Sequence, residues 1–370
     1  MRKQTQTLKH IAPLITVFLL IVSLLISCQL LPSSTPTPDE PLTENSSAEA
    51  LVTPPDLPVT FQSTLLNPLD TPHVYTEETC KYLRNKWNPL NAEPGTVVLA
   101  ILFNNINRGT ADLPDSINVQ DFKDLMEQLR AQGFEAIDSK QLQAFVERNI
   151  KIPPRSVVLI QVGNQNVEFF EVLYQGYFEK YGWPVVNAWV SDNQTSEAIR
   201  QGNFLLEEKG LVDHQAGGIS PDRNLSDNTA KIVIARELQG SLDGFAATFS
   251  KTPTMVIWPN GGFGIRPVDA ARQLRFKLGF TANARGPIMY NWVPLADEVD
   301  PARPDLIPEG PISDPVMTLP AFPAEEALNA IDLARIIGKE AKDYALSNKD
   351  IEHNYYEIVC ADAYGPMPTP

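Results

Sequence analysis

Histidine is scarce in this chain of 370 residues, which contains four. They are His10, His73, His214 and His353, and no two of them stand at the spacing that places two imidazoles on one metal ion. A zinc site needs three or four nitrogen, sulfur or oxygen ligands in a tetrahedral arrangement. The sequence therefore predicts no local zinc motif, and His214 could bind zinc only together with residues distant in sequence.

Other local signatures of catalysis are also missing. The chain has no Gly-x-Ser-x-Gly nucleophile elbow, no glycine-rich phosphate loop and no Cys-x-x-Cys pair. These absences exclude the commonest motif-based enzyme classes. They do not exclude an enzyme as such.

Positive charge is in deficit, with 30 Lys and Arg against 45 Asp and Glu and a formal net charge of −15. Proteins that bind nucleic acid or anionic phosphate polymers carry basic surfaces that neutralise the phosphates. The composition therefore argues against nucleic acid as a partner and is compatible with neutral or cationic glycans.

The N-terminus has the layout of an export signal. Three basic residues precede an apolar run over residues 11–26, and Cys28 follows soon after. This run of about sixteen residues is shorter than the roughly 20 apolar residues that span a bilayer. We therefore expect a lipoprotein signal peptide over residues 1–27 and lipidation of Cys28, which anchors the chain to a membrane through several acyl chains. A transmembrane anchor and an ordinary signal peptide are the weaker alternatives.

A polar linker is expected after the anchor. Residues 31–59 are rich in Pro, Ser, Thr and acidic residues and poor in aromatics, so they cannot bury enough apolar surface to offset the entropy of ordering. We assign residues 28–74 to the lipidated cysteine and a disordered linker, with a structured arm on the domain as the alternative. Residues 75–365 are expected to fold as a single domain, because no repeat or change in composition divides them.

Once Cys28 is lipidated, Cys80 and Cys360 are the two remaining cysteines, and they stand at opposite ends of the domain. In an oxidising compartment such a pair is a plausible disulfide, and two buried free thiols are the alternative.

The domain alternates between strand-like and helix-like segments. A continuous apolar run over residues 96–103 predicts a buried strand, and helical spacing over residues 118–132 predicts an amphipathic helix with Asn118 as N-cap. Further strands are expected over 135–137, 156–162, 185–190, near 212 and over 254–258, and further helices over 139–147, 168–181, 196–201, 231–249 and 268–278. Roughly seven such units predict an α/β barrel, with functional residues at the carboxyl ends of parallel strands.

The chain after residue 280 is different. It is rich in proline and lacks periodicity until a predicted helix over residues 324–341, so we expect it to wrap the barrel as a long loop. Residues 355–360 are expected to form a final strand that returns the chain beside Cys80.

Four stretches of the domain resemble the polysaccharide deacetylase superfamily, carbohydrate esterase family four. They are residues 122–146, 152–164 (IPPRSVVLIQVGN), 169–192 and 256–264 (VIWPNGGFG). The likeness is strongest to the lipoprotein deacetylases of poly-β-1,6-N-acetylglucosamine. It implies a distorted (β/α)7 barrel similar to a TIM barrel, in agreement with the periodicity.

The chemistry of that family needs a metal held by one Asp and two His, with a carboxylate as base and a His as acid. The family's Asp-Asp-Gly motif reads Val162-Gly163-Asn164 here, and the loop with the family's His-x-x-x-His motif supplies His214 alone. We therefore expect no cofactor. A divalent metal such as zinc is expected only if the family's activity persists.

Polar and aromatic residues at the strand ends are the candidate substrate-binding residues. Trp258 and Asn260 belong to a Trp-Pro-Asn-Gly-Gly turn that could present a platform to a sugar, or that could simply need its glycines. Asn104 and Asn164 could hydrogen-bond a neutral ligand, and Trp292 could line the same mouth. Solvated loop polarity explains these residues equally well.

His214 beside Asp213 is the candidate catalytic pair, a general base oriented by a carboxylate. A polar loop contact without catalytic function is the alternative.

Together these observations predict a lipid-anchored, extracytoplasmic protein on the cell membrane or an outer membrane. We expect a catalytically inactive polysaccharide-deacetylase-like domain that binds a cell-envelope or extracellular glycan. An active N-deacetylase with a non-standard site and a surface scaffold for protein partners are the alternatives.

Overall fold

The computed structural model describes residues 53–109 and 116–369. The predicted signal peptide, the lipidation site Cys28 and the first part of the predicted linker lie outside these residues. Among the helices described, none is long and apolar enough to cross a bilayer.

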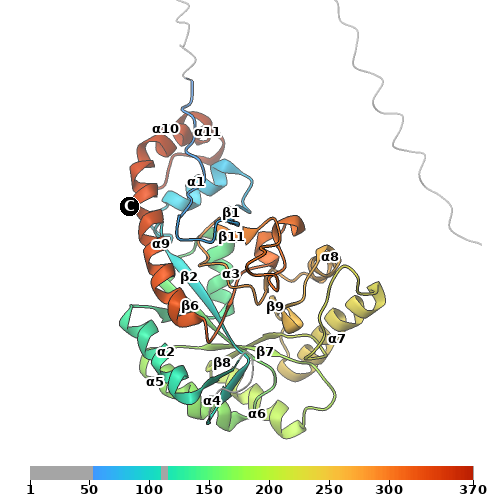
Figure 1. Cartoon of the computed structure of the whole chain (residues 1–370). Helices are drawn as coiled ribbons and strands as arrows, with labels where there is room; N and C mark the ends of the chain where they lie inside the picture. Colours follow the sequence, from blue (N-terminus) through green and yellow to red (C-terminus); the bar gives the residue numbers. More distant parts are fainter. Residues whose placement is uncertain (1–52, 110–115, 370) are drawn as a thin grey trace, which may run out of the picture. The chain divides into compact units, whose positions relative to one another are not determined.

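Parallel strands form the framework of the domain (Figure 1). Seven strands follow the order β10-β9-β8-β7-β6-β2-β12, and β5 (Glu135–Ala136) pairs with the first part of β6. The seven are β2 (Val97–Phe103), β6 (Arg155–Val162), β7 (Val185–Trp189), β8 (Val212–Ala216), β9 (Met255–Ile257), β10 (Leu278–Phe280) and β12 (Phe322–Pro323). Leu319 forms a bridge to β10 and β12 pairs with β2, so residues 319–323 connect β10 to β2. The predicted α/β fold with a curled, barrel-like parallel sheet is confirmed.

Helices cover the outer face of this sheet. They are α2 (Val119–Ala131), α4 (Val167–Leu173), α5 (Gln175–Tyr181), α6 (Glu197–Glu208), α7 (Lys231–Phe249), α8 (Ile265–Gln273) and α9 (Ala327–Ser347). The predicted N-cap is confirmed, because the Asn118 side chain accepts hydrogen bonds from two backbone N–H groups of α2. The helix expected over 168–181 is broken at Tyr174, whose buried hydroxyl donates to Gln161 on β6. The helix expected over 268–278 ends earlier, and Leu278 begins β10.

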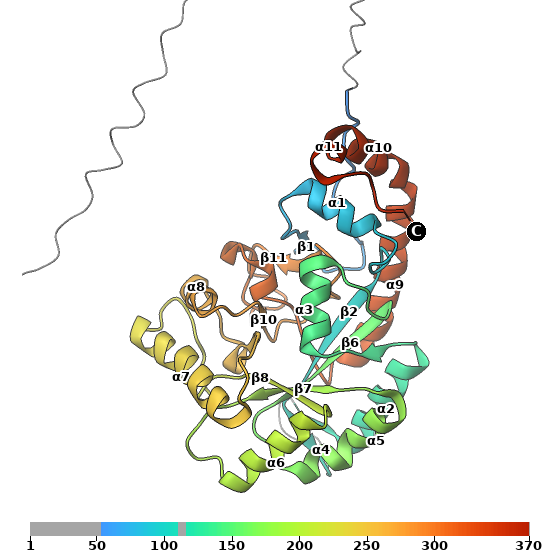
Figure 2. The ribbon, with the colours of Figure 1, turned by 180° about the vertical axis from the view of Figure 1, so that it is seen from behind.

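One helix, α3 (Ser139–Arg148), lies on the concave face of the sheet (Figure 2). Its Leu142 and Phe145 pack with Val98 and Val158, which belong to the first halves of β2 and β6. The helix therefore fills the amino-terminal end of the barrel.

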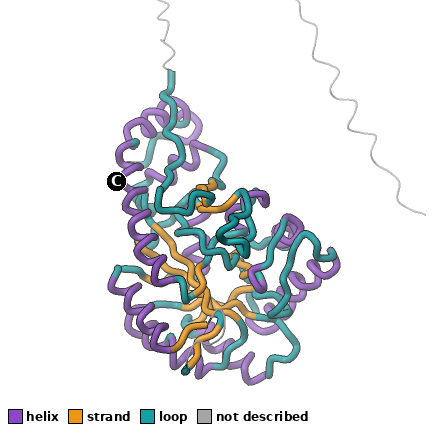
Figure 3. The backbone as a smooth tube through the Cα atoms, in the orientation of Figure 1, coloured by secondary structure: helices purple, strands orange, loops and turns teal. Residues whose placement is uncertain are grey.

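The segment between β10 and β12 is largely loop, as predicted (Figure 3). It contains β11 (Val293–Ala296) and two short 3-10 helices, η2 (Gly310–Ile312) and η3 (Pro315–Met317). Two further short strands, β3 (Asn105–Asn107) and β4 (Ser116–Asn118), pair with each other after β2. The 3-10 helix η1 (Pro259–Gly261) follows β9.

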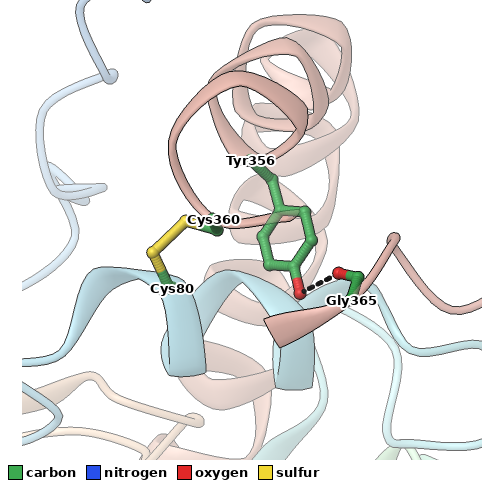
Figure 4. Close-up of a disulfide and its surroundings, with 4 residues drawn as sticks. All are labelled: Cys80, Tyr356, Cys360 and Gly365. Carbon is green, nitrogen blue, oxygen red and sulfur yellow. Dashed lines mark hydrogen bonds between the residues drawn. A yellow bond between two sulfur atoms is a disulfide. The ribbon is translucent and has the colours of Figure 1, made fainter. Parts of the chain in front are cut away.

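Helices from near the two ends of the described chain lie together in a small lobe (Figure 1). It contains α1 (Thr79–Trp87), α10 (Lys349–Val359) and α11 (Ala361–Tyr364), and the predicted disulfide between Cys80 and Cys360 is present, with a Cα–Cα distance of 5.4 Å (Figure 4). The prediction of a final strand over residues 355–360 is wrong. Glu352, Tyr356 and Cys360 are buried at helical spacing, so this stretch is the end of α10 rather than a strand.

Part of the predicted linker lies on the domain. The carbonyl of Phe61 accepts a hydrogen bond from Trp292 Nε1 at 2.8 Å, and β1 (Asp70–His73) pairs with β11. Leu66 and Asp70 are buried. The folded chain thus begins before residue 75, because the apolar side chains of Phe61 and Leu66 pack against the core of the barrel.

Candidate functional site

The carboxyl edge, where the parallel strands of the sheet end, is the first place to look for a site. Asn164 lies there, after β6, but its side chain already makes three hydrogen bonds. Its Nδ2 donates to the Val190 carbonyl and to Thr195 Oγ1, each at 2.7 Å, and its Oδ1 accepts from the Val190 N–H at 2.9 Å. Asn164 therefore holds the loops after β6 and β7 together and has little capacity left for a ligand.

Asn104 follows β2 at the same edge and is half-buried, and the neighbouring Asn105 is exposed. Within the described part of the chain, the Asn104 side chain has no hydrogen-bond partner. Of the predicted asparagines, it is the one next to the sheet whose amide remains free to bind a ligand.

The backbone of the turn after β9 requires glycine for structural reasons. Asn260 has φ of 51° and Gly261 has φ of 66°, and a Cβ on Gly262 would lie 1.8 Å from Asn224 Oδ1. Trp258 is only 2 % exposed and donates from Nε1 to the Met317 carbonyl at 2.7 Å. Trp258 is therefore a core residue and no platform for a sugar, whereas Asn260 is exposed at the carboxyl edge.

Trp292 does not share this edge. It lies four residues after Ile288, which pairs with Val98 at the start of β2, whereas Asn104 follows the end of that strand. Its ring contacts Phe61 and is 4 % exposed. The expectation that Trp292 lines the same mouth as Asn104 is therefore wrong.

His214 is fully buried between the sheet and the helices. Its Nδ1 lies 2.9 Å from Glu207 Oε2 and its Nε2 lies 2.9 Å from Asn203 Oδ1, both on α6. The Phe249 ring stacks on the imidazole at 4.3 Å. Both ring nitrogens are thus occupied, and no substrate could reach them.

Asp213 precedes His214 on β8 and therefore faces the opposite side of the sheet. It accepts hydrogen bonds from the Ser139 N–H at 2.8 Å and from Gln215 Nε2 at 2.9 Å, and Lys251 Nζ lies 3.0 Å away. The predicted catalytic pair is thus split between two faces, and neither residue opens to the carboxyl edge. The alternative of a non-catalytic polar contact fits this geometry.

Lys251 is the cation shared by the two carboxylates of this group, because it pairs with both Asp213 and Glu207. Burial raises the pKa of Glu207 and of Asp213, but Lys251 and the hydrogen bonds outweigh it and hold both pKa values below their usual range. Burial lowers the pKa of His214, against the opposite effect of Glu207. In such a network the loss of one partner leaves a buried charge unpaired, so the three side chains depend on one another.

The family's metal does not fit this site. In residues 53–109 and 116–369, no group of three or more His, Cys, Asp or Glu side chains is arranged to hold a metal ion. The positions of the family's two carboxylates are occupied by the apolar Val162 and by Gly163, whose φ is 83°. We derive no metal-dependent step from these residues.

A hollow of about 430 Å³ lies beside the carboxyl edge, between the chain after β2 and the start of α4. Phe169 is half-buried in its wall, and Asn166 is the N-cap of α4, with Oδ1 accepting from the Phe169 N–H at 2.9 Å. The exposed side chains of Arg108 and Glu168 approach to 3.9 Å at its rim. Sequence reasoning did not select these residues, because the hollow depends on how the chain after β2 packs against α4.

The sequence matches no family model and no curated protein. Among solved structures it is similar to the Streptococcus pyogenes deacetylase PplD in complex with acetate, with a TM-score of 0.50 and 14 % identity over 64 % of this chain and 99 % of that one. It is also similar to IcaB from Ammonifex degensii, with a TM-score of 0.50 and 11 % identity over 65 % of this chain and 98 % of that one. At such identities the likeness concerns the fold alone. The protein therefore has the α/β fold of the polysaccharide deacetylases, a curled sheet of seven parallel strands covered by helices.

Proposed function

We propose that this protein is a lipid-anchored, extracytoplasmic glycan-binding protein that uses the deacetylase fold without deacetylase activity. One observation carries the proposal: the carboxyl edge offers neutral amides and a hollow with one half-buried aromatic ring, and the ionisable residues of the predicted catalytic pair are buried elsewhere.

The chemistry of the hollow suits a sugar. The half-buried Phe169 ring offers an apolar face for the C–H groups of a pyranose, and Asn166 Nδ2 is a donor for a hydroxyl or an acetamide oxygen. Arg108 and Glu168 at the rim add charged hydrogen-bonding groups. The free amide of Asn104 lies at the same edge of the sheet.

Binding can be measured by calorimetry on residues 28–370 with acetylated and deacetylated N-acetylglucosamine oligomers. We expect Phe169→Ala to weaken binding up to about tenfold, because it removes the ring but leaves the backbone of α4 in place. Asn166→Ser should weaken binding without unfolding the helix, since serine retains a capping oxygen. Ile232→Ala, at an exposed apolar position on α7, is the matched control.

Two results would count against glycan binding at this hollow: no affinity for any oligomer, or equal affinity in Phe169→Ala and Ile232→Ala. The loss of catalysis is tested separately, by acetate release with added Zn²⁺, Co²⁺ or Ni²⁺. Acetate release above background would overturn the assignment as an inactive protein.

The anchor has its own test. We expect the membrane-bound wild-type protein to begin at Cys28 and to carry acyl chains on that residue, as measured by mass spectrometry of its N-terminal peptide. An unmodified Cys28 in a chain that retains residues 1–27 would favour a transmembrane anchor.

A further inference from the structure

A second cavity, of about 150 Å³, lies at the amino-terminal end of the barrel, away from the carboxyl edge. Its walls come from α1, from the end of α3, from the residues before β11, and from α9 and α10. Residues 57–61, from the part of the predicted linker that folds, also line it.

Several aromatic rings form part of the wall. Tyr82 and Tyr290 are stacked, with ring centroids 6.0 Å apart and an interplanar angle of 21°. Phe61 contacts Trp292 at 6.0 Å and Tyr344 at 5.6 Å. Flat aromatic surfaces of this kind pack well against a flat or ring-shaped ligand.

A few polar groups reach the same space. Lys86 Nζ donates to Glu352 Oε1 at 2.7 Å, and Glu352 Oε2 accepts from Trp87 Nε1 at 2.6 Å. An ammonium carries three donors, and Glu352 is the one hydrogen-bond acceptor of Lys86 among the residues described. The Tyr82 hydroxyl has no hydrogen-bond partner in the same part of the chain.

The charges decide what kind of ligand fits. Lys86 and Glu352 neutralise each other, and Glu93 at the wall pairs with Lys342 at 2.8 Å. Neither an anion nor a cation would find an uncompensated opposite charge, and burying an unpaired charge is expensive. The cavity therefore favours a neutral ligand with an oxygen acceptor for Lys86 or Tyr82.

The covering segment is held by two hydrogen bonds to its backbone and by the ring contacts of Phe61. Tyr344 Oη donates to the Val59 carbonyl and Trp292 Nε1 donates to the Phe61 carbonyl, each at 2.8 Å. Residues 57–61 form no helix or strand. A ligand in the cavity would contact this segment and the barrel at once, so its binding would reduce the opening of the segment.

We propose that this cavity is a binding site for a small neutral molecule with a single ring and a hydroxyl or carbonyl oxygen, separate from the glycan site. An apolar cavity of about 150 Å³ is large enough for benzene in an engineered protein. Binding there tightens residues 57–61, the segment between the predicted anchor and the barrel.

The test uses residues 28–370 with phenol as probe, and with benzoate and benzylammonium as charged analogues. Calorimetry should detect phenol binding, with at least tenfold weaker binding of both charged probes. Ala345→Met, which fills the cavity, should abolish phenol binding, whereas Ala198→Met at an exposed position on α6 should not change it. Tyr82→Phe, which removes only the hydroxyl, should weaken phenol binding severalfold.

A second measurement does not depend on any variant. Phenol should slow chymotryptic cleavage after Phe61 in the wild-type chain, because cleavage there requires residues 57–61 to leave the barrel. The proposal is overturned if phenol fails to bind, if it binds Ala345→Met as tightly as wild type, if a charged probe binds more tightly, or if the rate of this cleavage is unchanged.

Discussion

Several polar side chains of this protein make hydrogen bonds that hold the fold together instead of binding a ligand. Asn164, Trp258 and His214 were selected from the sequence for their functional groups, yet each uses those groups to hold the structure together. Buried polar atoms must be paired, since an unpaired one costs about 1–3 kcal/mol. A polar residue at a strand end is therefore as often a structural link as a ligand.

Lys251 gives the sharpest prediction at this scale. Lys251→Met leaves Glu207 and Asp213 without their cation, so we expect a loss of about 2 kcal/mol at pH 7, less than the about 3–5 kcal/mol of a fully buried pair because Lys251 is partly exposed. Urea unfolding measures this loss. Lys209→Met, at an exposed position just after α6, should be neutral.

Glu207 and Asp213 also make the free energy of unfolding depend on pH in the acid range. Their folded pKa values lie below the unfolded ones, so their contribution is present above about pH 4.5 and is lost as the pH falls through the folded pKa values. In Lys251→Met both pKa values should rise, and acid unfolding should begin at higher pH. An unchanged acid midpoint in circular dichroism would contradict this account of the network.

Trp258 offers a contrast with the proposed glycan site. Trp258→Phe removes the hydrogen bond to the Met317 carbonyl and should lower stability by about 1 kcal/mol. Glycan affinity should stay at the wild-type value, because the indole is buried. If a stable Trp258→Phe protein lost glycan affinity, Trp258 would have to be part of the binding site.

At the scale of elements, the disulfide connects two helices from opposite ends of the chain. Cys80 on α1 and Cys360 after α10 are 280 residues apart, and the hydroxyl of Tyr356 donates to the Gly365 carbonyl beside them (Figure 4). Closing so long a loop restricts the unfolded chain, and the chain-entropy model gives up to about 5 kcal/mol for it.

We therefore expect Cys80→Ala/Cys360→Ala to unfold at a clearly lower temperature. Hydrogen exchange should increase first in α1 and α10, whereas β2 and β6 at the centre of the sheet should stay protected. Uniform acceleration across the barrel would mean that the lobe and the sheet unfold as one unit.

At the scale of the whole molecule, both buried salt bridges and apolar contacts determine where the folded chain begins. Asp70 accepts from Arg285 Nη1 at 2.9 Å and from Arg303 Nη2 at 2.7 Å, and Arg285 also pairs with Glu309. Asp70, Arg285 and Glu309 have no exposed side-chain surface. The chain from residue 70 onward is thus tied to the loops after β10 and β11.

This arrangement predicts that a fragment of residues 75–370 is much less stable than one of residues 53–370. The shorter fragment loses the partner of a buried arginine, which costs about 3–5 kcal/mol, together with the apolar contacts of Leu66. Thermal unfolding of the two fragments measures the difference. Equal melting temperatures would show that residues 53–74 add nothing to the fold.

The sequence alone determined the local elements and their order. Apolar runs predict β2 and β6, helical spacing and Asn118 predict α2, and the two remaining cysteines predict their own disulfide. These features depend on neighbours in sequence or on residue type, and patterns report them directly.

Only the tertiary structure decided which way the polar residues point. Adjacent residues on β8 face opposite sides of the sheet, so His214 points toward the helices and Asp213 toward the concave face. Trp292 lies at the end of the barrel opposite Asn104. Packing of the chain after β2 against α4 forms the hollow at Phe169, and packing of α1 against α10 brings Tyr82, Lys86 and Glu352 to one cavity. These positions depend on contacts between residues far apart in the chain, so no local pattern in the sequence contains them.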